Sequence, residues 1–192
     1  LTIIEGTRFV EFRRALEAHP EVKVTLRGLS DAEVMRELGL EGHPEGRFFP
    51  DTYRFAAGTS DRELLQLAYR RMNELLMRLW AERAQGLPID TPEQALVLAS
   101  IIEKESGVAS ERPRVAGVFV SRLRLGMRLQ SDPTVIYGIG AGFNGNLTRS
   151  NLQTDTPYNT YTRDGLPPTP IALPSRNAIF ASVHPAAGSA LY

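Results

Sequence analysis

TPEQALVLASIIEKES, residues 91–106, is the stretch of the chain from which the fold follows. An N-cap threonine, a proline at the first helical position and a glutamine that reaches back to the cap predict the start of a helix. The run ALVLASII that follows is apolar on nearly every side, so we expect a buried central helix. The helix then carries Glu103, Lys104 and Glu105 straight out of this run, where a buried charge is costly unless it is paired or used.

Other helices are expected on both sides of the central one. Capping boxes at Ser30 and Ser60 open two of them. The predicted helices cover residues 7–18, 30–38, 60–85, 110–125, 131–137 and 175–185. Short strands are expected at residues 1–6, within 45–55 and at 190–192. This mixture predicts the α+β class, a helix-rich domain with a central glutamate-bearing helix and a few short strands, including a small subdomain over residues 1–58.

Composition narrows the classes of function. The 192 residues carry 22 basic and 22 acidic side chains, so no global field attracts nucleic acid or anionic lipid. The chain has no cysteine, which excludes disulfides, thiolate metal sites and cysteine nucleophiles. Its three histidines are scattered without ligand spacing, so we expect no metal site. No apolar run in the sequence has the length of a membrane span, and no signal peptide is visible.

Two glutamates at the end of the central helix are candidates for acid–base chemistry. Glu105 extends an apolar row formed by Leu98, Ile101 and Ile102, and Glu103 continues a similar row. A glutamate packed against apolar side chains keeps its proton to a higher pH, as a general acid requires. The alternative is that the helix simply emerges into solvent, because most acidic residues are exposed. Periodicity does not choose between these interpretations.

A second polar cluster lies in the irregular half of the chain, in segments 127–138 and 156–168. Its amide, carboxylate and aromatic side chains are Gln130, Asp132, Tyr158, Asn159 and Tyr161. Amide groups and flat aromatic faces suit sugar rings that carry hydroxyl and N-acetyl groups. The alternative is that Asp132 belongs to a helix cap and that the tyrosines pack in the core.

Three long motifs carry a resemblance to a known family. They are EGRFFPDTYRF (residues 45–55), ASIIEKESGVASERPRVAGVFVSRLRLGMRLQSDPTVIYGIG (residues 99–140) and TPYNTYTRDGLPPTPIALP (residues 156–174). The chain resembles the endolytic murein transglycosylase family, known as MltG or YceG-like, over essentially its whole length. The resemblance implies a bacterial lyase that cuts peptidoglycan strands internally between N-acetylmuramic acid and N-acetylglucosamine. It leaves a 1,6-anhydro end and needs no metal or organic cofactor.

The resemblance also implies a set of site residues. The family's single catalytic glutamate precedes a small hydroxyl residue, which here makes it Glu105, followed by Ser106. Glu105 would protonate the glycosidic oxygen and then remove the proton of the C6 hydroxyl. The family pattern gives four groove-lining residues, Gln130, Tyr158, Asn159 and Tyr161.

Supporting roles are expected for three more residues. Ser106 belongs to the catalytic motif, and Asp132 and Glu103 would orient their neighbours. We expect Glu103 to be structural, paired with an arginine such as Arg114 or Arg128, because buried carboxylates are usually paired.

The sequence departs from the family pattern in two respects. Thr169 stands where the family's proline loop commonly has glycine. The family also has a membrane helix and a LysM-like lobe before this region and a strand segment after it, so residues 1–192 are expected to be the catalytic fragment of an anchored extracytoplasmic enzyme. Its expected partners are peptidoglycan strands and, by resemblance, peptidoglycan synthases. Two rival functions are a non-catalytic glycan-binding or scaffold module and a hydrolysing muramidase that uses Glu105 with Glu103 or Asp132.

Overall fold

The fold is built almost entirely from helices. A computed structural model describes residues 1–188, so the strand predicted at 190–192 lies outside the described residues. The helices are α1 (Phe9–Ala18), α2 (Asp31–Glu37), α3 (Asp61–Ala81), α4 (Pro92–Glu105), α5 (Arg112–Arg124), α6 (Asp132–Ile139), the short 3-10 helix η1 (Gly140–Gly142), α7 (Arg149–Gln153) and α8 (Arg176–Val183). Along residues 1–188, every helix is too short or too polar to cross a membrane. The predicted helices are all present, with α3 ending four residues before the expected position.

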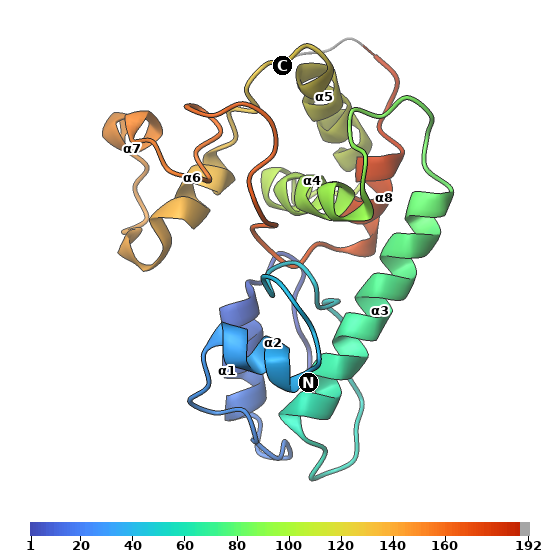
Figure 1. Cartoon of the computed structure of the whole chain (residues 1–192), viewed down its shortest axis with the longest axis vertical. Coiled ribbons are helices and arrows are strands. Elements are labelled where there is room, and N and C mark those ends of the chain that lie inside the picture. Colours follow the sequence, from blue (N-terminus) through green and yellow to red (C-terminus); the bar gives the residue numbers. More distant parts are fainter. Residues whose placement is uncertain (189–192) are drawn as a thin grey trace.

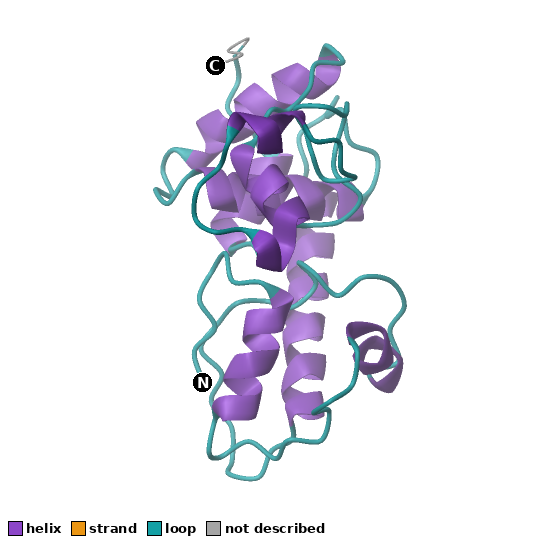
Figure 2. Cartoon of the chain, turned by 90° about the vertical axis from the view of Figure 1, so that its left-hand side faces the viewer, coloured by secondary structure: helices purple, strands orange, loops and turns teal. Residues whose placement is uncertain are grey.

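The strands predicted at residues 1–6 and within 45–55 do not form, so the β part of the α+β class is not confirmed. Pairing among residues 1–188 is limited to two isolated bridges, Thr2 with Thr52 and Lys23 with Ser60. Figure 2 accordingly shows helices and loops in this part of the chain. The segments 1–6 and 45–55 pair only around Thr2 and Thr52, because Pro50 has no N–H and the chain turns at Gly6 with a positive φ of 74°. The observed class is helix-rich with almost no strand.

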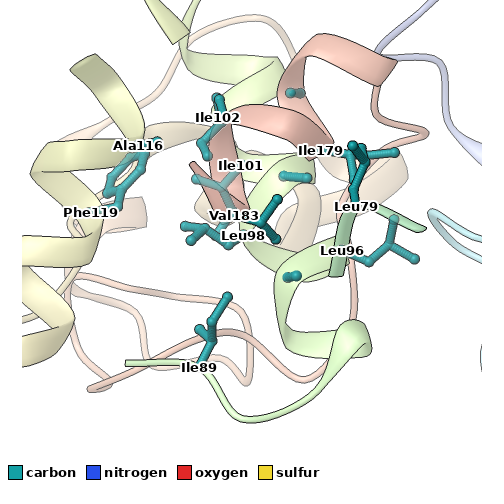
Figure 3. Packing of buried hydrophobic residues seen from close by; sticks show 14 of the residues in the cluster. Leu79, Ile89, Leu96, Leu98, Ile101, Ile102, Ala116, Phe119, Ile179 and Val183 are labelled. Carbon is teal, nitrogen blue, oxygen red and sulfur yellow. The ribbon is translucent and has the colours of Figure 1, made fainter. Parts of the chain in front are cut away.

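Two hydrophobic clusters meet along α3. The lower cluster joins α1, α2 and the first half of α3, and its aromatic centre includes Phe9 stacked on Phe48 at 4.8 Å between ring centroids. The upper cluster surrounds α4 and uses the second half of α3 (Figure 3). The subdomain predicted for residues 1–58 stays a prediction, and the lower cluster to which it corresponds continues into α3 as far as Ala68.

The central helix α4 is confirmed. It packs against α8, α5, α3 and α6, and it lies between these helices in Figure 1. The Thr91 hydroxyl accepts the Gln94 N–H and caps its start, as predicted. Leu98, Ile101 and Ile102 are fully buried. Each such side chain contributes about 1.5–3 kcal/mol through burial, so the position of the α4 C-terminus is fixed by the core.

Candidate active site

The two glutamates at the end of α4 lie in opposite environments. Glu103 is buried, and Glu105 is exposed. The helix ends at Glu105 and Ser106 is extended, so the row of buried side chains stops before it reaches the second glutamate. Of the two interpretations that periodicity left open, the structure supports the solvent-exposed one for Glu105. Glu105 instead presents its carboxylate to solvent from a rigid helix end.

A buried serine holds the exposed carboxylate. The Ser131 hydroxyl donates a 2.6 Å hydrogen bond to Glu105 Oε1, although Ser131 itself is only 1% exposed. The Thr160 hydroxyl accepts the Ser131 N–H at 3.0 Å, and the Thr134 hydroxyl donates to the Ser131 carbonyl at 2.7 Å. These contacts fix Ser131 from behind, so one oxygen of Glu105 is held in a set direction.

Sequence reasoning missed Ser131, although it singled out Gln130 and Asp132 on either side. The one signal in the sequence was that Ser131, a hydroxyl residue, lies directly between these two candidate site residues. Gln130 has φ +52°, a left-handed conformation that is costly for a residue with a side chain. Its N–H donates to the Thr160 carbonyl at 3.1 Å, which anchors the backbone in this conformation. The turn presents Ser131 to Glu105 and leaves the Gln130 side chain exposed.

Asp132 and Tyr161 form a second polar pair at the site. The Tyr161 hydroxyl donates to Asp132 Oδ1 at 2.6 Å. Burial raises the pKa of Tyr161 to about 12, and the bond to Asp132 and the charge of Glu105 act in the same direction. Tyr161 therefore stays a hydrogen-bond donor throughout the physiological pH range. The structure brings Glu105, Asp132 and Tyr161 together at one end of α4.

Glu103 is paired, but with a different arginine from the two expected. Arg112 donates to Glu103 Oε1 at 2.7 Å, and both side chains are 5% exposed. The Ser175 N–H donates to the other oxygen of Glu103 at 2.8 Å, and Arg112 also donates to the Ser175 hydroxyl at 2.7 Å. Arg128, one of the expected partners, bonds Asp164 instead at 3.1 Å. Arg112 is the partner because it begins α5, where that helix meets the end of α4 and the start of α8.

Ser106 stabilises the turn that follows α4. Its hydroxyl lies 3.0 Å from Glu111 Oε2 and accepts the Val108 N–H at 3.1 Å. Its carbonyl accepts a bond from Arg112 Nε at 3.3 Å. Ser106 thus holds the chain beside Glu105, and its hydroxyl bonds are made within the turn.

Asn159 and Tyr158 do not form an open groove wall in this structure. Asn159 is fully buried, its amide donates to three backbone carbonyls and its oxygen accepts the Tyr161 N–H at 2.8 Å. The direct contact between Asn159 and glycan that we expected is therefore replaced by a role in holding the 151–161 loop. Tyr158 is half-buried, with its ring against Tyr137 at 4.8 Å and its hydroxyl 2.8 Å from the Thr169 hydroxyl. The threonine at the family's glycine position thus ties the proline loop to this aromatic pair.

Two hollows flank the end of α4. One, of about 490 Å³, is lined by Lys104 and Pro133, the sequence neighbours of Glu105 and Asp132. The other, of about 670 Å³, is lined by Glu103, Lys104 and Gly107. Glu105 itself lines neither hollow. The site therefore consists of one exposed carboxylate, held by a hydroxyl donor, and its sequence neighbour Lys104 lines both hollows.

Comparisons with known proteins agree on one family. The YceG-like family model matches residues 1–192. The endolytic murein transglycosylase of Bacillus subtilis is 30% identical over 210 residues, covering 100% of this chain and 58% of that protein. The one from Streptococcus pneumoniae is 31% identical over 163 residues, covering 82% of this chain and 29% of that protein.

A solved structure agrees with these sequence matches. The crystal structure of a putative YceG-like protein from Listeria monocytogenes has a TM-score of 0.69 and 28% identity, covering 100% of this chain and 68% of that one. This chain spans little more than half of the Bacillus subtilis relative and less than a third of the Streptococcus pneumoniae one. Because the family model and the fold both match over the full length of the sequence, the chain belongs to the YceG-like family.

Proposed function

We propose that this chain is the catalytic domain of an endolytic murein transglycosylase, with Glu105 as its acid and base. The relatives in Bacillus subtilis and Streptococcus pneumoniae bear that name. The observation that carries the proposal is the 2.6 Å bond from the Ser131 hydroxyl to Glu105 Oε1. It joins the end of α4 to the residue before α6, both within the family motif of residues 99–140, at a solvent-facing carboxylate. We assign the second oxygen, Oε2, to the substrate.

The reaction divides into two proton transfers at Glu105. The protonated carboxyl first gives its proton to the glycosidic oxygen, and the bond from that oxygen to C1 of N-acetylmuramic acid breaks. The N-acetyl group of the same sugar stabilises the positive charge at C1. The C6 hydroxyl then attacks C1, and the ionised Glu105 takes its proton. The products are a 1,6-anhydro end and a free hydroxyl on the departing N-acetylglucosamine, and no water is consumed.

The surrounding residues support these transfers by orientation. The hydrogen bond from the Ser131 hydroxyl holds Glu105 Oε1 in a set direction during both transfers. Asp132 keeps Tyr161 oriented through their 2.6 Å bond. The exposed side chain of Gln130 and the ring of Tyr161 are the groups that we assign to the glycan itself.

A hydrolysing muramidase is the rival enzyme. Hydrolysis requires a second carboxylate as nucleophile or as base for water. Glu103 is buried and paired with Arg112, and one oxygen of Asp132 accepts the Tyr161 hydroxyl. Glu103 is therefore engaged in the core and does not serve as the second carboxylate, which favours the single-glutamate reaction and leaves Asp132 as the candidate of a muramidase.

Product analysis tests the proposal. Purified peptidoglycan is digested with the unsubstituted chain, with Glu105→Gln and with the control Glu93→Gln, an exposed glutamate in the first turn of the same helix. We expect anhydro ends by mass spectrometry from the unsubstituted chain and the control, and none from Glu105→Gln. Reducing ends would identify a muramidase. Uncut glycan that the chain nevertheless binds would identify a scaffold module.

The cellular setting forms part of the same proposal. Peptidoglycan strands lie outside the cytoplasmic membrane, so we place this domain on that side, held by a segment outside the given sequence and close to the synthases. Protease treatment of intact spheroplasts that carry the full-length protein tests this placement. Protection of the domain in intact spheroplasts would contradict it.

A further inference from the structure

The hollow of about 490 Å³ lies between the start of α1 and helix α6, and one of its cations has a hydrogen-bond donor without an acceptor. Arg8 lines this hollow, and its Nε is buried without a hydrogen-bond partner within residues 1–188. The guanidinium lies 4.6 Å from the centre of the Tyr137 ring, a cation–π contact. A buried donor without an acceptor is unfavourable, so this Nε is a point at which an incoming acceptor gains free energy.

The nearest carboxylate does not satisfy Arg8. Glu45 Oε2 is 4.0 Å from Arg8 Nε, beyond hydrogen-bond distance. The oxygens of Glu45 accept the Phe9 N–H at 2.8 Å and the Tyr137 hydroxyl at 3.2 Å. Glu45 is therefore held by the backbone of α1 and by α6, and it cannot move to Arg8 without losing these bonds.

A second underused cation lines the same hollow. Within the described chain, the Lys104 ammonium makes one hydrogen bond, a long one of 3.4 Å to the Gly6 carbonyl. The one acidic residue among the described lining residues is Glu11. Its Oε2 accepts the backbone N–H of Arg8 at 2.8 Å. The rest of the lining includes Ile136, Tyr137 and Phe143, which form an apolar wall. Two cations and an apolar wall suit an organic carboxylate.

The hollow adjoins the site that we propose for catalysis. Lys104 precedes Glu105 on α4, and Pro133 follows Asp132 on α6. In Figure 1, α6 lies beside the end of α4 and above α1. The hollow therefore lies next to the sequence neighbours of both site carboxylates, and we place a substituent of a sugar bound at Glu105 there.

We propose that this hollow binds a carboxylate carried by the N-acetylmuramic acid unit, with Arg8 and Lys104 as its ligands. The identity of the sugar rests on the proposed function. The carboxylate has two chemical sources, because N-acetylmuramic acid bears a lactyl ether whose acid is free in denuded strands and carries a peptide stem in native ones. The stem has carboxylates of its own. Either source supplies a hydrogen-bond acceptor for Arg8 Nε and Lys104, and it distinguishes this sugar from neutral N-acetylglucosamine.

Binding measurements in the Glu105→Gln chain test the proposal without turnover. The probes are a neutral chitotetraose, a denuded tetrasaccharide with two free lactyl groups, and the same tetrasaccharide with peptide stems. Arg8→Gln and Lys104→Gln remove one cation each. Arg14→Gln is the matched control, because Arg14 is an exposed cation on α1 outside the hollow. Calorimetric titration gives the affinities, and thermal unfolding verifies that each variant is folded.

We expect Arg8→Gln and Lys104→Gln each to weaken binding of the carboxylate probes by about tenfold, the loss of one charge-assisted bond. Chitotetraose should bind all variants equally, Arg14→Gln should match the parent, and Arg8→Lys should recover part of the loss. Weakening limited to the stem-bearing probe assigns the carboxylate to the peptide, and weakening of the denuded probe assigns it to the lactyl group.

Other results overturn the proposal. They are an equal loss for chitotetraose, no loss in either variant, or no preference of the parent for carboxylate probes. A chain that binds carboxylate probes in this way but cuts no peptidoglycan would keep the binding site and disprove the proposed activity. A chain that cuts peptidoglycan without any carboxylate preference would do the reverse.

Discussion

The buried pair of Glu103 and Arg112 fixes the end of α4, and a double-mutant cycle measures how strongly. Glu103→Met leaves the Arg112 guanidinium only 5% exposed and without its counter-charge. It also removes the acceptor of the Ser175 N–H, a bond of 2.8 Å at the start of α8. Arg112→Met leaves the Glu103 carboxylate buried and takes a donor from the Ser106 carbonyl.

The expected cost follows from the burial of both charges. Removal of one partner of a buried ion pair costs about 3–5 kcal/mol, because the other charge stays buried without compensation. We therefore expect Glu103→Met to lower the free energy of unfolding by about 4 kcal/mol. For a chain of 192 residues, this corresponds to a fall in Tm of about 8–16 °C. The double variant replaces both charges with apolar side chains, so its cost should be well below the sum of the two single costs.

Urea unfolding provides the measurement, with an exposed ion pair as control. Midpoints and slopes are compared for the parent, both single variants and the double variant. Glu37→Gln removes an exposed carboxylate 3.8 Å from Arg62 and should cost about 0–1 kcal/mol. A loss below about 1 kcal/mol for Glu103→Met, or costs that add in the double variant within about 0.5 kcal/mol, would refute the reasoning.

Three further predictions concern single residues. Burial raises the pKa of Glu45 to about 6 from its ordinary 4.5. Between these two pH values the folded chain therefore holds a proton that the unfolded chain has released. The stability from this protonated form is complete below pH 4.5 and is lost as pH rises through 6. Relative to Glu45→Gln, the parent should lose about 2 kcal/mol between pH 4 and pH 7 in urea unfolding, and parallel curves would contradict this. Gln130→Gly relieves the left-handed conformation and should raise the free energy of unfolding by about 1 kcal/mol while weakening glycan binding; a loss of stability would disprove the strain. Asn159→Ala removes four hydrogen bonds of a fully buried amide and should cost about 2–4 kcal/mol in thermal unfolding, whereas an unchanged Tm with weaker glycan binding would restore the contact first expected.

The helices were predictable because their signals are local. Serine and threonine caps, a proline in the first turn and an apolar run act within a few residues, and the capping boxes at Ser30 and Ser60 form as the sequence indicates. The strands were not predictable in the same way. An extended segment becomes a strand only when a partner continues beside it, and the partners of residues 1–6 and 45–55 diverge after isolated contacts.

The residues of the candidate site also differ in whether the sequence alone could predict them. Sequence and family resemblance singled out Glu105, Asp132, Gln130 and Tyr161, and the structure brings Glu105, Asp132 and Tyr161 together. They did not give Ser131 as the donor to Glu105 or the burial of Asn159, because both depend on how the 127–138 and 156–174 segments meet at the end of α4.

The sequence by itself determined the described helices other than η1 and α7, the central position of α4 and the family motifs with their glutamate, since these depend on local patterns and on identity along the chain. Only the tertiary structure decided that Glu103 pairs with Arg112 and that Arg8 and Lys104 line one hollow. It also decided that Glu105 faces solvent while it accepts a hydrogen bond from Ser131. The physical reason is that these outcomes depend on burial and on distances between segments far apart in the chain. Neither quantity is encoded in the spacing of residues within a single segment.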